Sequence, residues 1–102
     1  MLRIYGVALK MLEAMRPAIE EIEKKDRDLA RQMRRAGSSV VLNIAEGMGS
    51  SGGTRRERYR NALGSVRELR GGLDVGRVLG YIGPVVIEEM REVTGSLVRL
   101  SR

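Results

Sequence analysis

Apolar residues recur every three or four positions along most of the chain, which is the spacing of one face of an α-helix. The first row predicts a helix over residues 3–24 and consists of Ile4, Ala8, Met11, Met15, Ile19 and Ile22. Pro17 lies inside this row. Because proline lacks a backbone N–H group, we expect either a kink near residues 15–18 or a break there.

A second row predicts a helix over residues 26–48. Its members are Leu29, Met33, Ala36, Val40 and Ile44. Asp26 is expected to cap the N-terminus of this helix, and Gly47 and Gly49 are expected to end it. The glycine- and serine-rich segment 47–53 predicts the loop that follows.

A third helix is predicted to begin at Thr54, because Thr54 and Glu57 have the three-residue spacing of a capping box. Its apolar row consists of Tyr59, Ala62, Val66, Leu69 and Leu73. Gly71, Gly72 and Gly76 fall near the end of this helix. They could weaken it or allow another backbone to approach closely, and the sequence leaves both interpretations open.

Residues 80–84 predict a turn, with Pro84 at the first position of a last helix. The row that follows is Val86, Met90, Val93, Leu97 and Leu100. All three connections are expected to be short, so successive helices should be antiparallel. The sequence therefore predicts an all-α protein, an antiparallel up-down-up-down four-helix bundle that forms a single domain over residues 1–102.

The residue composition excludes several classes of site. The chain contains no histidine and no cysteine, which removes the commonest general base and the usual zinc ligands. No motif for a nucleophile or a cofactor is present, so we expect no catalytic residues, no metal and no cofactor. One enzymatic alternative is an acid–base pair formed by Glu46 and Glu68.

Membrane association is not expected. No apolar run approaches the roughly 18 residues that a spanning helix needs. The N-terminus lacks the apolar run and cleavage site of a signal peptide, so the expected location is the cytoplasm.

The positive charge is concentrated in one part of the chain. The net charge is +6, and residues 24–60, with ten basic and four acidic residues, account for the whole excess. Arginine suits bidentate contacts with phosphate, which predicts binding to a nucleic-acid backbone. The predicted contact residues are Arg27, Arg31, Arg34, Arg55, Arg56, Arg58 and Arg60. The alternative is a solvated face that forms salt bridges between subunits.

A polar row lies beside the apolar row of the second helix. It consists of Gln32, Arg35, Ser39, Asn43 and Glu46, and the third helix offers Ser65 and Glu68 at similar positions. Half-buried polar groups need partners, so we predict a structural hydrogen-bond network with Arg35 paired to Glu46 or Glu68. On that basis, Glu46→Ala should cost roughly 1–3 kcal/mol of stability.

Three segments resemble the four-helix-bundle family encoded in intervening sequences of bacterial 23S ribosomal RNA genes. They are QMRRAGSSVVLNIAEG (residues 32–47), ALGSVREL (62–69) and LGYI (79–82). The matching motif positions are Gln32, Arg35, Ser39, Asn43, Glu46, Gly47, Gly64, Ser65 and Glu68. The chain departs from the family pattern at Gly37 and Ser38 and at residues 70–72.

The resemblance implies ring-like homo-oligomers, typically pentamers. It also implies a relation to the accessory protein of diversity-generating retroelements, which binds a reverse transcriptase and nucleic acid. Together with the charge, it favours a non-enzymatic homo-oligomeric bundle that binds RNA or DNA through an arginine-rich surface. The alternative is a protein-interaction adaptor, for example an accessory subunit of a reverse transcriptase.

Overall fold

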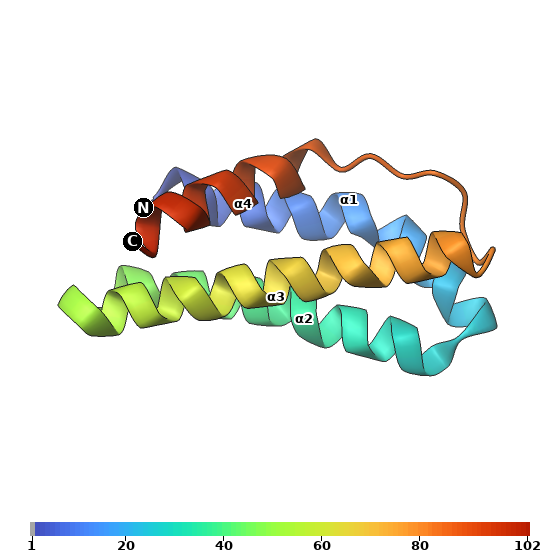
Figure 1. The fold of residues 1–102 in the computed structure, drawn as a ribbon, viewed down its shortest axis with the longest axis horizontal. Helices are drawn as coiled ribbons and strands as arrows, with labels where there is room; N and C mark the ends of the chain where they lie inside the picture. Colours follow the sequence, from blue (N-terminus) through green and yellow to red (C-terminus); the bar gives the residue numbers. More distant parts are fainter. Residues whose placement is uncertain (1) are drawn as a thin grey trace.

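Four helices make up the protein in the computed structural model, which describes residues 2–102. They are α1 (Arg3–Lys25), α2 (Arg27–Met48), α3 (Gly52–Val78) and α4 (Glu88–Leu100). α1 and α3 each pack against both α2 and α4, and the two ends of the chain meet at one end of the bundle (Figure 1). The predicted all-α up-down-up-down four-helix bundle is confirmed.

The apolar rows predicted for the first three helices face a common core. Every member of the α1 and α3 rows is buried, and in the α2 row only Leu29 remains partly exposed. Tyr59 and Leu69 of α3 are among the most completely buried side chains. α1 is continuous through Pro17, which excludes a break at that residue.

Two glycines near the end of α3 allow close helix packing. A Cβ atom at Gly72 would lie 2.6 Å from Cγ of Met33, and one at Gly76 would lie 2.9 Å from Cδ1 of Ile22. Gly71, in contrast, has open space around it. α3 continues through all three glycines to Val78, so close approach is the correct interpretation for two of them.

The predicted start of the third helix is wrong by two residues. α3 begins at Gly52, and no side-chain bond of a capping box forms at its N-terminus. The backbone N–H of Arg55 instead donates to the carbonyl oxygen of Ser51 at 3.4 Å, which closes the first turn before Thr54 is reached. The loop between α2 and α3 is therefore shorter than the glycine-rich segment suggests.

The predicted start of the last helix is also wrong. α4 begins at Glu88 rather than Pro84, and residues 79–87 form a long connection that we call the strap. Three consecutive β-branched residues, Val85, Val86 and Ile87, favour extended backbone over helix. Val86 was expected in the core but is 82% exposed, whereas Met90, Val93 and Leu97 are buried as predicted.

Asp26 is the single residue between α1 and α2, and it holds three segments together. Its Oδ1 accepts a hydrogen bond from the backbone N–H of Leu29 at 2.9 Å, which confirms the predicted N-cap. The hydroxyl of Tyr81 in the strap donates to Oδ2 of Asp26 at 3.3 Å. Desolvation and the nearby Asp26 carboxylate raise the pKa of Tyr81 above its ordinary value.

Within residues 2–102, none of the helices combines the length and the apolar character that crossing a lipid bilayer would require.

Candidate nucleic-acid interface

Three of the predicted contact arginines, Arg27, Arg31 and Arg34, lie in the first turns of α2 and form what we call the α2 cluster. Arg31 pairs with Asp28 at 2.7 Å, and Arg34 pairs with Glu23 of α1 at 2.9 Å. The Arg34 guanidinium holds the pKa of Glu23 below its ordinary value. These pairs are exposed, so the cluster remains open to solvent.

The other four, Arg55, Arg56, Arg58 and Arg60, lie in the first turns of α3 and form the α3 cluster. Arg58 pairs with Glu46 of α2 at 3.0 Å, and Arg60 is 3.8 Å from Glu57.

Arg55 has a second role that the sequence does not reveal. Its Nε donates to the carbonyl oxygen of Ser50 at 2.8 Å and to that of Gly47 at 3.2 Å. These carbonyls belong to the end of α2 and the loop that follows, where an α-helix leaves carbonyl groups without intrahelical partners. Arg55 therefore helps to close the α2–α3 loop as well as adding charge.

The two clusters lie at opposite ends of the antiparallel α2–α3 pair (Figure 1). Arg58 is beside Glu46 at the C-terminal end of α2, whereas Arg31 is near its N-terminus. The rise from Arg31 to Gly47 along α2 is about 24 Å. The structure thus divides into two clusters what the sequence presents as one basic segment.

A shallow depression on α2 connects the two clusters. It is lined by Arg34 and Arg35 toward one end, by Ser38 and Asn43 in the middle, and by Arg58 of α3 at the other end. Leu42 also lines it and is 60% exposed. We call this surface, together with the two clusters, the α2 track.

The polar row on α2 meets α3 through one serine pair. The hydroxyl of Ser65 donates to Oγ of Ser39 at 2.8 Å, and Nδ2 of Asn43 donates to the same oxygen at 3.0 Å. Nδ2 of Asn43 also lies 2.9 Å from the carbonyl oxygen of Ser39. These bonds link the middle of α2 to the middle of α3.

The remaining members of the polar row lie apart from this group. Gln32, Arg35 and Glu68 line a second hollow between α2 and α3. Arg35 forms an ion pair with neither Glu46 nor Glu68, so that predicted pairing is wrong; Glu46 contacts Arg58 instead. Glu46 and Glu68 line different hollows, and no group of three metal-ligating side chains is present among residues 2–102.

The exposure of Glu46 changes the expected cost of removing it. The side chains of Arg58 and Glu46 are 43% and 54% exposed, and exposed ion pairs contribute at most about 1 kcal/mol. We expect Glu46→Ala to lower the free energy of unfolding by less than about 1 kcal/mol in urea denaturation, with Glu57→Ala as the matched control. A loss above roughly 2 kcal/mol would show that Glu46 belongs to a buried network after all.

A family model described as 23S rRNA-intervening sequence protein matches residues 1–101. Comparisons with curated proteins and with solved structures gave no match.

Proposed function

The chain belongs to the 23S rRNA-intervening sequence protein family, and from this premise we propose that it is a non-enzymatic, homo-oligomeric bundle that binds the phosphate backbone of RNA or DNA along the α2 track. The observation that carries the proposal is the exposure of both arginine clusters in the segment that holds the whole positive excess of the chain. Phosphate contacts of this kind release condensed counterions, which favours binding without reading bases.

The ion pairs already present oppose such binding only weakly. The side chains of Arg31 and Asp28 are 71% and 79% exposed, and those of Arg60 and Glu57 are 55% and 63% exposed. Exposed pairs contribute little free energy because water screens them. A phosphate can therefore replace or share the carboxylate partner at a small cost, and Arg27 and Arg56 form no ion pair with any described residue.

The length of the α2 track limits which ligands can use both clusters. A separation of about 24 Å corresponds to roughly seven base-pair steps of a duplex. A shorter duplex can contact only one cluster at a time, whereas a longer one can contact both. Affinity should therefore rise with length up to about this size.

Filter binding tests the proposal directly. We expect retention of a duplex of about 20 base pairs at 50 mM salt, with log K falling linearly against log salt at a slope of roughly −3 to −6 for four to seven phosphate contacts. A duplex of about four base pairs should show a shallower slope. Absence of retention at 50 mM salt would overturn the proposal, and sedimentation of the same sample would give the number of subunits, a pentamer being the family expectation.

The adaptor function is the second candidate, and exposed apolar side chains favour it. Leu42, Val78 and Val86 are 60%, 71% and 82% exposed, and large apolar side chains at the surface commonly mark contacts with other proteins. An accessory subunit of a reverse transcriptase would use such contacts. Co-purification of a partner that survives nuclease treatment would favour this function, and loss of every partner after nuclease treatment would oppose it.

A further inference from the structure

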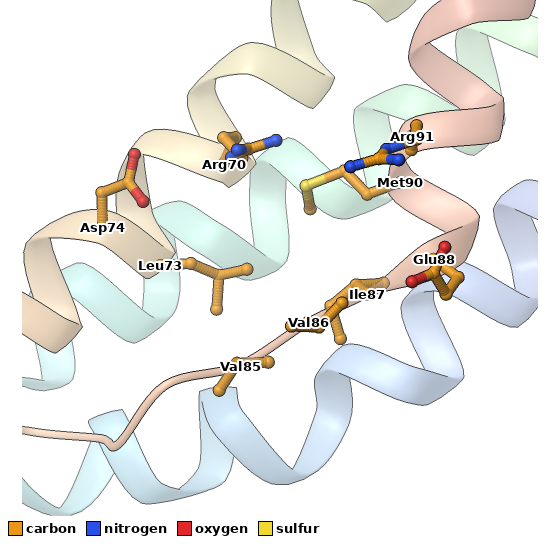
Figure 2. A pocket seen from close by; sticks show the side chains of 9 residues that line it. All are labelled: Arg70, Leu73, Asp74, Val85, Val86, Ile87, Glu88, Met90 and Arg91. Carbon is orange, nitrogen blue, oxygen red and sulfur yellow. The ribbon is translucent and has the colours of Figure 1, made fainter.

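A groove of about 230 Å³ lies between the strap, α3 and the start of α4, and none of its lining residues belongs to the α2 track (Figure 2). Leu73 of α3 and Met90 of α4, both buried, contribute apolar surface to it. Val85, Val86 and Ile87 of the strap form one side. The groove therefore combines an apolar lining with a wall of extended backbone.

Two arginines, Arg70 of α3 and Arg91 of α4, line the same groove without carboxylate partners. Asp74 is four residues after Arg70, and Glu88 is three residues before Arg91, spacings at which ion pairs commonly form on a helix. Neither arginine forms an ion pair with any residue in the described part of the chain. Figure 2 shows the two guanidinium groups directed toward one another, with the Met90 side chain between them in that view.

The charges at the groove fit an anionic group. Two guanidinium groups that face each other repel, and a carboxylate between them would convert that repulsion into two charge-assisted interactions. Asp74 and Glu88, which also line the groove, would repel a polyanion that ran along its length. The charge distribution thus suits one carboxylate held between Arg70 and Arg91 rather than a row of phosphates.

The strap offers backbone groups for the same ligand. The N–H groups of Val85, Val86 and Ile87 donate to no acceptor within residues 2–102. Extended backbone with free N–H and C=O groups is the template for strand addition, in which a peptide in extended conformation pairs with it. Alternate side chains of such a peptide could then pack on the apolar surface of Leu73 and Met90.

We infer that this groove binds an extended acidic peptide segment of a partner protein, with one carboxylate between Arg70 and Arg91 and the backbone paired to residues 85–87 of the strap. The lining contains no aromatic side chain on which a nucleotide base could stack, which further disfavours single-stranded nucleic acid. The inference does not depend on the α2 track, since the two surfaces share no residue.

Selection of displayed random peptides of about ten residues on the full chain tests the inference. We expect enrichment of peptides that carry an aspartate or glutamate within an apolar, β-branched context. A synthetic copy of the most enriched peptide should shift the amide NMR signals of Val85, Val86 and Ile87. The same peptide with the acid replaced by its amide should bind about tenfold more weakly.

A pair of charge-matched double variants locates the carboxylate. Arg70→Gln with Arg91→Gln should weaken peptide binding about tenfold, while Arg67→Gln with Arg99→Gln, on the same two helices but outside the groove, should leave it unchanged. Circular dichroism should show equal helix content in both. Failure to enrich acidic peptides, or equal binding by the two double variants, would overturn the inference.

Duplex binding measured on the same double variants separates this inference from the proposed function. If Arg70→Gln with Arg91→Gln weakened duplex binding but left peptide binding intact, the groove would be part of a nucleic-acid surface and the inference would be wrong. If peptide binding is lost and duplex binding is retained, the inference holds whatever the fate of the α2 track.

Discussion

Replacement of Arg55, Arg56, Arg58 and Arg60 by glutamine is expected to weaken duplex binding roughly a thousandfold at 0.1 M salt. Each lost phosphate contact removes about 0.7 to 0.9 from the slope of log K against log salt, so four contacts change the slope by about 3. The same factor, at 0.1 M salt, gives about three orders of magnitude in affinity. A salt titration by filter binding measures both quantities on one sample.

A variant of equal charge separates local contacts from overall charge. Its four glutamines replace arginines that lie outside both clusters and outside the groove: Arg16, Arg67, Arg77 and Arg99. It should retain most of the affinity, since long-range charge is screened beyond about 10 Å at this salt concentration. Equal losses in the two variants would mean that only net charge matters, and the α2 track would not be the binding surface.

Arg55 requires a separate check because it also holds two loop carbonyls. A triple variant that keeps Arg55 and replaces Arg56, Arg58 and Arg60 leaves this loop contact in place. Its slope should change by about 2 to 3 rather than 3 to 4. Thermal melting of both variants shows whether the loss of the Arg55 contact affects the fold.

Gly47→Val is expected to lower the free energy of unfolding by about 2–3 kcal/mol through overpacking. A Cβ atom at Gly47 would lie 2.5 Å from Cε1 and 2.9 Å from Cζ of Tyr59. The Tyr59 side chain is only 1% exposed, so its ring cannot move without displacing neighbouring core side chains. Urea denaturation of the variant, compared with the parent chain, measures the loss.

Two further variants identify the cause of that loss. Gly64→Ala, on α3 where a Cβ atom meets nothing within 4 Å, should raise stability by up to about 1 kcal/mol because alanine favours helix. Replacement of Tyr59 by leucine alongside Gly47→Val should remove part of the clash, so the two substitutions should be less than additive. Full additivity would contradict a direct contact between residues 47 and 59.

The sequence predicts most of the fold because the core is built on a regular spacing. Rows such as Met11, Met15 and Ile19 follow the helical repeat so closely that burial could be read from position alone. The starts of α3 and α4 were missed because local rules compete there. Pro84 permits a helix start, but the β-branched residues that follow it favour extended backbone, and the second effect prevails.

The candidate site is less predictable because it depends on which ends of the helices meet. The seven arginines are close in sequence, yet the antiparallel arrangement of α2 and α3 separates them into two clusters. The pairing of Glu46 with Arg58 rather than Arg35 depends on side-chain positions that spacing does not specify. Arg70 and Arg91 are twenty-one positions apart on different helices, and nothing in their local patterns indicates that they line one groove.

The one-residue connection at Asp26 makes the chain-entropy cost of the fold very uneven. Joining α1 to α2 closes almost no loop, whereas the pair between Arg3 and Glu92 joins residues 89 positions apart. Loop-closure entropy grows with the logarithm of loop length, so the contacts that α4 makes with α1 are the most costly to form. The shortest helix in the protein thus closes its longest loop, and the apolar side chains of Met90, Val93 and Leu97 must offset that cost.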